Sequence, residues 1–210
     1  MDYRLFIAIP VPSAVQEALG QAQDKLREAL PLSGIRWGRP DQIHLTLRFL
    51  GDVPEERVAG LTQALEGVCA AVAPLPLAAR GLGCFPESRR PRVLWAGVDE
   101  PAAERASRRP LTRLKTSLDA TAHAFTGEPP EAHFSPHLTL GRFKFVVPAE
   151  ALALAKLAHG FAQHSFGSWT AEHLELMRSE LAPEGPVHTC LAKVSFSAVP
   201  RPAGEVKVEG

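Results

Sequence analysis

The sequence has few cysteines, no net charge and no long apolar run. Its three cysteines, Cys69, Cys84 and Cys190, are widely spaced and form no Cys-x-x-Cys pair. They provide no disulfide framework, so a reducing compartment such as the cytoplasm is the expected location. Lys plus Arg and Asp plus Glu each number 23, and the formal charges cancel. A neutral chain does not hold nucleic acid by bulk charge, so any such contact must come from a local basic cleft.

The apolar segments are too short to cross a membrane. The N-terminal run Met1–Pro10 lacks the charged and apolar regions of a signal peptide. A chain of 210 residues with 45% apolar composition suits one large domain or two tightly joined lobes. We therefore expect a soluble cytoplasmic protein in which residues 1–210 form a single bilobal domain.

Metal-ligand patterns are weak in this sequence. His133 and His137 are four residues apart, which is the spacing of a zinc-binding pair on a helix. However, Pro136 lies between them and disfavours a helix, and no His-Glu-x-x-His motif or clustered carboxylate accompanies them. We predict no metal site and no cofactor.

Hydrophobic periodicity predicts alternating strands and helices along the whole chain. Helices are predicted over residues 13–30, from Pro54 to about 68, over 101–124 and from Pro148 onward. Strands are predicted over residues 4–9, around 35–37, and over 43–50, 75–84, 92–98, 136–145, 166–178 and 187–197. Several strand pairs are joined by short turns, which favours antiparallel pairing. The tail after Pro200 is expected to be loose.

The two halves of the chain carry matching parts. Each half offers strands, helices and one strand with the pattern His-x-Thr-x, and no Gly/Ser-rich linker separates them. The predicted fold class is therefore α+β, with two lobes related by a pseudo-twofold axis. Each lobe is expected to be a mostly antiparallel sheet with outer helices, and the lobes should flank a central cleft.

The strongest signal is a pair of identical tetrads, His44–Leu47 and His137–Leu140, both His-Leu-Thr-Leu. Side chains alternate between the two faces of a strand, so each histidine shares a face with its threonine while the leucines pack on the other. Strict alternation also places Arg48 on the face of the first histidine, where it could bind phosphate. A polar stripe that occurs twice is hard to explain by folding needs alone.

Two histidines that converge across a twofold axis suit the hydrolysis of a phosphodiester. The attacking water must lose a proton while the leaving oxygen gains one, and imidazole, with an unperturbed pKa of about 6.5, can do either task. The hydroxyls of Thr46 and Thr139 can donate to non-bridging phosphoryl oxygens, and an arginine can neutralise the charge that grows there. The residues alone do not say which histidine is the acid.

Longer runs around the tetrads resemble a known family. These runs are Arg4–Ile9, Arg36–Pro40, His44–Gly51, Pro91–Val98, Phe134–Arg142 and Arg178–Leu181. They resemble the 2H phosphoesterase superfamily, and in particular the bacterial and archaeal RNA 2′,3′-cyclic phosphodiesterases once described as 2′-5′ RNA ligases. The resemblance covers nearly the whole chain.

The resemblance implies metal-independent opening of a 2′,3′-cyclic phosphate to a 2′-phosphomonoester, with RNA that ends in such a phosphate, or a cyclic nucleotide, as the substrate. It implies that His44 donates a proton to the leaving 3′ oxygen and that His137 accepts the proton of water. It also implies that Thr46 and Thr139 hold phosphoryl oxygens and that Arg142 binds phosphate. No obligate protein partner is evident, and we expect a monomer.

Arg142 poses a geometric problem for its implied role. Strict alternation from His137 places it on the leucine face, away from the site. A β-bulge at Gly141, or a strand that ends there, would return Arg142 to the histidine face. Regular pairing through residue 143 would contradict the role.

Other side chains near these motifs are weaker candidates. A basic rim for RNA phosphates, or alternatively a solvated turn surface, is formed by Arg36, Arg39, Arg89, Arg90 and Arg92. Stacking on a base, against the alternative of core packing, is considered for Trp37, Phe49 and Phe134. Surface or core positions are expected for the histidines without a repeated context, namely His123, His159, His164, His173 and His188.

Three other functions compete with hydrolysis. The first is the reverse reaction, which joins RNA ends through a 2′-5′ bond, although water should win over a second RNA end in dilute solution. The second is a nucleotide-binding module without catalysis, which the two intact histidines disfavour because binding needs no proton relay. The third is a metal-dependent phosphatase, which the weak metal-ligand pattern disfavours.

Overall fold

The computed structural model describes residues 1–86, 90–101, 109–131, 133–182 and 185–197 of the chain. These residues form nine strands: β1 (Asp2–Pro10), β2 (Gly34–Trp37), β3 (His44–Pro54), β4 (Leu75–Phe85), β5 (Val93–Asp99), β6 (His137–Phe145), β7 (Ser165–Ala171), β8 (His173–Ala182) and β9 (Gly185–Ser195). The strands pair in one sheet in the order β7-β4-β5-β6-β3-β1-β8-β9, and β2 pairs with β6 beside this path. Every strand pair among the described residues is antiparallel.

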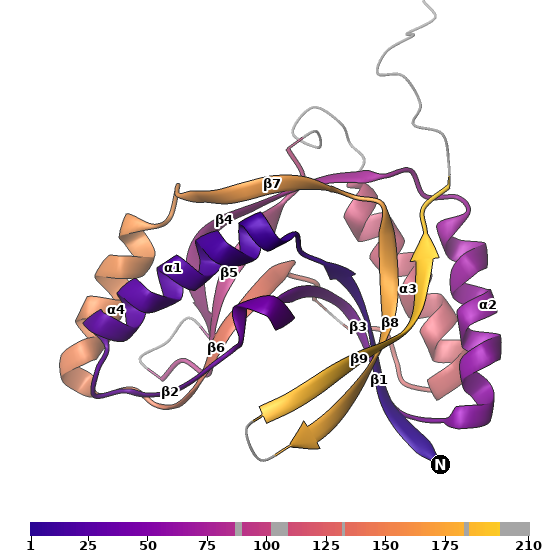
Figure 1. The fold of residues 1–210 in the computed structure, drawn as a ribbon, viewed down its shortest axis with the longest axis horizontal. Helices are drawn as coiled ribbons and strands as arrows, with labels where there is room; N and C mark the ends of the chain where they lie inside the picture. Colours follow the sequence, from indigo (N-terminus) through magenta and orange to yellow (C-terminus); the bar gives the residue numbers. More distant parts are fainter. Residues whose placement is uncertain (87–89, 102–108, 132, 183–184, 198–210) are drawn as a thin grey trace, which may run out of the picture.

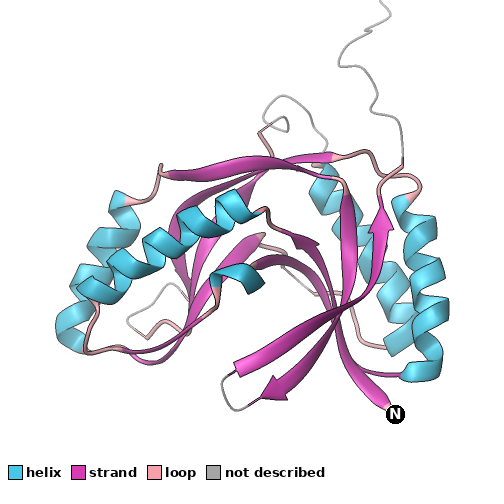
Figure 2. Cartoon of the chain, viewed as in Figure 1, coloured by secondary structure: helices cyan, strands magenta, loops and turns pink. Residues whose placement is uncertain are grey.

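Helices cover the two ends of the sheet. The described residues form the α-helices α1 (Ser13–Ala29), α2 (Val58–Cys69), α3 (Pro110–Thr126) and α4 (Pro148–Gly160), and the short 3-10 turns η1 (Pro40–Gln42) and η2 (Glu55–Arg57). Figures 1 and 2 show α1 and α4 together at one end of the molecule and α2 and α3 at the other, with strands between them. The α+β class with mostly antiparallel pairing and outer helices, predicted from the sequence, is confirmed.

Amphipathic spacing explains why the helices lie where they do. In α1 the buried positions Val15, Leu19, Ala22 and Leu26 recur at intervals of three or four residues, which gives one apolar stripe. That stripe joins the core formed with the leucines of the strands. Pro110 and Pro148 stand at the first positions of α3 and α4, where a missing backbone N–H costs nothing.

A pseudo-twofold relation is visible in the order of the strands. From the central pair outward, the sheet runs β3-β1-β8-β9 on one side and β6-β5-β4-β7 on the other. Helix α3, from the second half of the chain, packs against β3 and α2, whereas α1, from the first half, packs against β7 and α4. Each lobe therefore contains elements of both halves, and the two lobes are interleaved.

Several predicted boundaries need correction. The strand predicted over 166–178 is two strands, β7 and β8, and Glu172 between them belongs to neither. The helix predicted from Pro54 begins at Val58, because β3 continues to Pro54 and η2 follows it. The helix predicted over 101–124 is α3 and begins at Pro110, while residues 102–108 and the tail after Pro200 lie outside the described residues.

Candidate active site

The two tetrads lie side by side at the centre of the sheet, on the neighbouring strands β3 and β6 (Figure 1). Leu45 pairs with Leu138 across these antiparallel strands, and both leucines are fully buried. Leu45–Leu138 is the one residue pair that β3 and β6 share among the described residues, and alternation from it puts each tetrad's histidine and threonine on the face away from the leucines. We call this side of the sheet the histidine face.

Both imidazoles are held in the same way by the backbone. Nδ1 of His44 lies 2.8 Å from the carbonyl oxygen of Gln42, and Nδ1 of His137 lies 2.8 Å from that of Ser135. A carbonyl oxygen accepts but cannot donate, so Nδ1 carries the hydrogen in each ring. The opposite nitrogen, Nε2, is thereby left to accept or donate a proton at the histidine face.

His44 lies in a more apolar environment than an exposed imidazole. Its ring stacks on Phe6 with centroids 4.9 Å apart, and His188 of β9 meets its edge at 5.4 Å. The pKa of His44 is lowered to about 4, chiefly by burial; a hydrogen bond to Gln42 opposes this shift and the charge of His188 adds to it. In the unliganded protein at neutral pH, His44 is therefore uncharged.

His137 is flanked by two aromatic rings from its own side of the sheet. Phe85 of β4 meets it at 5.1 Å in an edge-on contact, and Trp95 of β5 lies 6.4 Å away. The indole of Trp95 lies directly over Gly83, where a Cβ would come within 2.3 Å of the ring. The glycine therefore lets the tryptophan lie flat on β4 beside the second histidine.

A β-bulge follows the second tetrad and returns Arg142 to the histidine face. On β5, Trp95 pairs with Thr139, but the next residue, Leu94, pairs with Gly141. Leu140 is the extra residue, and Leu140 and Gly141 are both buried while Arg142 is exposed. The bulge predicted near Gly141 is present, and the geometric objection to Arg142 is removed.

A matching bulge follows the first tetrad, and it overturns the placement of Arg48. On β1, Ala8 pairs with Thr46 and Ile7 with Arg48, so Leu47 is the extra residue. Arg48 is consequently turned to the leucine face, where its side chain is 3% exposed. The prediction that Arg48 shares a face with His44, on which its expected phosphate contact depended, is wrong. Phe49, which is 56% exposed and faces Phe6 at 6.1 Å, takes the position on the histidine face.

Arg48 has structural partners instead. Its Nη2 donates to the carbonyl oxygens of Glu128 and Pro129 at 3.2 and 2.8 Å, and its Nη1 lies 3.6 Å from Asp119 of α3. Lys115 shares the same carboxylate. Because residues 128 and 129 precede the second tetrad, this buried cation connects the strand of one tetrad to the segment that leads to the other.

The remaining candidates are not gathered at one place. Arg36 lies on β2 directly opposite Arg142, while Arg39 is paired with Asp41 at 2.6 Å, and Arg89 lies outside the described residues. Among the aromatic candidates, Trp37 and Phe134 pack against the core, under Arg27 and Lys115 respectively. Phe49 is the one of these three that lies exposed on the histidine face.

His188 was expected on the surface or in the core and instead contacts His44. It also meets Phe6 edge-on at 5.0 Å, its Nδ1 is buried without a hydrogen-bond partner, and burial lowers its pKa. The sequence offers no repeated motif around His188. Its place depends on how the β8–β9 hairpin lies beside β1 (Figure 1), which local patterns do not encode.

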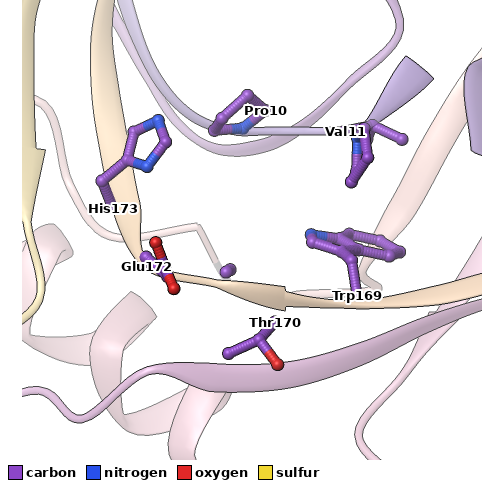
Figure 3. A pocket seen from close by; sticks show the side chains of 8 residues that line it. Pro10, Val11, Trp169, Thr170, Glu172 and His173 are labelled. Atoms are coloured by element: carbon purple, nitrogen blue, oxygen red, sulfur yellow. The ribbon is translucent and has the colours of Figure 1, made fainter. Parts of the chain in front are cut away.

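A cavity of about 210 Å³ lies where the end of β1 meets the turn from β7 to β8. Figure 3 shows Pro10 and Val11 on one side of it, Trp169 on another, and Glu172 and His173 opposite the indole. Pro10 pairs with His44 in the sheet, so the cavity begins one strand away from the first histidine. None of the tetrad residues lines it, which places it beside the paired histidines rather than between them.

The described parts of the chain hold neither a metal cluster nor a membrane-spanning helix. No three His, Cys, Asp or Glu side chains there are grouped so that they could hold a metal ion. No helix in the described ranges is long and apolar enough to span a membrane.

Comparison with known proteins supports an internal duplication of the chain. Residues 9–95 and 102–188 each match the family described as LigT-like phosphoesterase. A protein of Methanothermobacter thermautotrophicus called RNA 2′,3′-cyclic phosphodiesterase is 31% identical over 189 residues, which cover 90% of this chain and 96% of that protein. A protein of Thermus thermophilus with the same name is 35% identical over 199 residues, covering 92% and 90%.

Solved structures have the same fold. A crystal structure of a Thermus thermophilus protein superposes with a TM-score of 0.74 at 34% identity and covers 92% of this chain and 98% of that one. LigT of E. coli in complex with 3′-AMP superposes with a TM-score of 0.71 at 23% identity, over 94% and 100% of the two chains. With both halves matched, each around one His-x-Thr-x strand, this chain belongs to the LigT-like phosphoesterase family.

Proposed function

We propose that this protein hydrolyses the 2′,3′-cyclic phosphate at the end of an RNA, or of a cyclic nucleotide, to a 2′-phosphomonoester. The two histidines act as acid and base, and the proposed reaction needs no metal ion. The observation that carries the proposal is the identical anchoring of both rings, with Nδ1 bound to a carbonyl two residues earlier. Related proteins of similar length are called RNA 2′,3′-cyclic phosphodiesterases.

In the proposed step, a water oxygen attacks phosphorus and the bond from phosphorus to the 3′ oxygen breaks. His137 Nε2 takes the proton that the water loses, and His44 Nε2 gives a proton to the departing 3′ oxygen. The hydrogen on each Nδ1 stays on the ring and is donated to the backbone carbonyl oxygen throughout. Exchange with solvent then restores the starting protonation of the two rings. Proton transfers of this kind commonly contribute on the order of 10²–10⁴-fold each.

The low pKa of His44 places a condition on this assignment. A proton donor must be protonated when the reaction starts, yet the free protein holds the pKa of His44 at about 4. The anionic phosphate that binds beside it supplies an opposite charge, which raises the pKa of a neighbouring imidazole. Substrate binding and protonation of His44 are therefore coupled in the proposed mechanism.

The other side chains of the histidine face receive supporting roles. Thr46 and Thr139 share the histidine face with the histidines of their own tetrads and would donate hydroxyl hydrogens to the non-bridging oxygens. Arg142 would neutralise the charge that grows on them. Phe49, exposed on the same face, would stack on the base of the reacting nucleotide.

The proposal is tested by identifying the product. The protein is incubated with a nucleoside 2′,3′-cyclic phosphate in excess EDTA, and the product is assigned by ³¹P NMR against authentic standards. The proposal expects the 2′-phosphate. The 3′-phosphate would mean that the 2′ oxygen leaves, which reverses the assignment of the histidines relative to the ribose. Turnover that requires an added divalent metal would overturn the metal-free mechanism.

A further inference from the structure

Two cationic side chains face each other across neighbouring strands at the edge of the candidate site. In the register of β2 and β6, Arg36 pairs directly with Arg142, and both side chains are exposed. Residues directly opposite in an antiparallel pair point to the same face, with Cβ atoms about 4.5–5.5 Å apart. Because the bulge in β6 turns Arg142 to the histidine face, Arg36 lies on that face too.

The direction of Arg36 is fixed by its neighbours on β2. A Cβ at Gly141 would lie 3.0 Å from Cγ2 of Ile35 and 3.4 Å from the ring of Trp37, so these two side chains pack closely over the glycine. Trp37 is also covered by the guanidinium of Arg27, 5.0 Å from its ring centre. With Ile35 and Trp37 held on the leucine face, alternation along β2 leaves Arg36 to the histidine face.

Within the described parts of the chain, no carboxylate neutralises either arginine of this pair. No ion pair among the described residues includes Arg36 or Arg142, whereas Arg39 is paired with Asp41 and Arg48 with Asp119. Like charges directly opposite one another destabilise a strand pair. An anion bound between the two guanidinium groups would remove this repulsion and form charge-assisted hydrogen bonds with both.

We propose that Arg36 and Arg142 form a site for a second phosphate, the one on the 5′ side of the nucleotide that carries the cyclic phosphate. This inference rests on the proposed function. The terminal nucleotide of such an RNA has one phosphate besides the cyclic one, at its 5′ oxygen, with the ribose between them. Arg142 borders the tetrad on β6 and so lies between the two phosphates and serves both, whereas Arg36, one strand beyond it, serves the second phosphate alone.

The test compares two substrates that differ by that phosphate alone. One is a nucleoside 2′,3′-cyclic phosphate, and the other is the same compound with an added 5′-phosphate. The variant is Arg36→Gln, which keeps a polar side chain but removes the charge. Its matched control is Arg113→Gln, which removes an exposed arginine of α3.

We expect the 5′-phosphate to lower KM of the wild-type protein by about tenfold, since a hydrogen bond between charged groups contributes on the order of 1.5–3 kcal/mol. Arg36→Gln should raise KM for the 5′-phosphorylated substrate about tenfold more than for the plain one, and Arg113→Gln should change the two equally little. KM for the 5′-phosphorylated substrate should also rise less steeply with salt in Arg36→Gln than in the wild type, because one contact between charged groups has been removed.

Two results would overturn the inference. Equal losses on both substrates would mean that Arg36 serves the reacting phosphate or the fold, and no loss on either would mean that it is a solvated side chain. If the wild-type protein hydrolysed neither compound, the proposed function would fail separately. Calorimetric binding of the two compounds to wild-type and Arg36→Gln protein would then decide the second-phosphate site without catalysis.

Discussion

The strands β3 and β6 carry the same tetrad and the same bulge, but they differ in the residues just beyond it. Three residues after the threonine, β3 presents Phe49 to the histidine face and β6 presents Arg142. One position earlier, β3 has the buried Arg48 and β6 has Gly141. The acid–base frame is therefore nearly symmetric, whereas the groups that would hold base and phosphate are not. Because of this difference, a substrate with a base and a phosphate would bind in one defined orientation, although the pair of histidines is symmetric.

Packing explains why the two lobes diverge at this point. At Gly141, β2 crosses so closely that a Cβ would lie 3.0 Å from Ile35. At Arg48, the corresponding space opens toward α3, and the long side chain reaches Asp119 and the carbonyls of residues 128 and 129. The same bulge thus accommodates a glycine in one lobe and a buried cation in the other.

The largest expected effect concerns the histidines that the two lobes share. His44→Ala and His137→Ala should each lower kcat by on the order of 10²–10⁴-fold, because each removes one proton transfer. Steady-state hydrolysis of a nucleoside 2′,3′-cyclic phosphate in EDTA measures both. His159→Ala, at an exposed position of α4, is the control. Near-normal turnover in either tetrad variant would contradict the two-histidine scheme.

The next effect separates the two lobes. Arg142→Gln should lower kcat/KM by about 10²–10³-fold, which is typical for a lost donor to a developing oxyanion. Phe49→Ala should act mainly on KM and by roughly tenfold, as expected for one stacked base at about 1–3 kcal/mol. The same assay measures both variants with purine and pyrimidine substrates. Equal losses of kcat/KM in the two variants, or a larger loss in Phe49→Ala, would contradict the proposal that Arg142 binds phosphate and Phe49 binds the base.

The third prediction contrasts stability with activity at the position beside each bulge. Arg48→Ala should lower the free energy of unfolding by about 3–5 kcal/mol, because it leaves the buried carboxylate of Asp119 without one of its partners. Urea denaturation measures this, and Arg142→Gln should be at least as stable as the wild type, because it removes the like charge opposite Arg36. Arg48→Lys keeps the positive charge, and its free energy of unfolding should lie between those of Arg48→Ala and the wild type. If Arg48→Ala had normal stability but had lost phosphate binding, Arg48 would be a phosphate-binding residue and not a structural one.

The smallest expected effect is a pH dependence of stability that arises from His44 in the first lobe. Between pH 6.5 and about 4 the unfolded chain binds a proton at residue 44 that the folded chain does not, so stability is lost as the pH falls through this window. The loss can reach about 3 kcal/mol, and His44→Gln should lack it. His188→Ala should raise the pKa of His44 by opening its environment, as NMR titration of the imidazole would report. An unchanged pKa in that variant would show that His188 contributes nothing to the first site.

Much of the fold and of the site could be predicted from the sequence, because periodicity is a local property. Strand alternation correctly placed Leu45 and Leu138 in the core, and the duplicated tetrads indicated two related halves. Alternation predicted the wrong face for Arg48, one residue after the first tetrad. The bulge at Leu47 arises from pairing with β1, and no glycine beside it indicates a bulge in the sequence. At the second tetrad Gly141 supplied that signal, and the bulge could be predicted.

The features that the sequence did not reveal depend on distant parts of the chain. His188 reaches His44 only through the β8–β9 hairpin, which lies well over a hundred residues further along the chain. The exchange of α1 and α3 between the lobes likewise arises from long-range packing rather than from any local pattern. The division of 166–178 into β7 and β8 reflects a change of pairing partner, from β4 to β1, within a continuous strand-like sequence.

His44 and His137 are held in the same way, yet we propose that one donates a proton and the other accepts one. A substrate whose leaving group needs no proton separates these two roles most directly. In a 3′-deoxynucleoside 2′-(4-nitrophenyl phosphate), nitrophenolate replaces the 3′ oxygen and departs without protonation, so the acid becomes dispensable while the base does not. We expect His44→Ala to regain most of the wild-type rate on this compound and His137→Ala to remain inactive. Recovery in His137→Ala alone, or the same behaviour in both variants, would contradict the proposed roles.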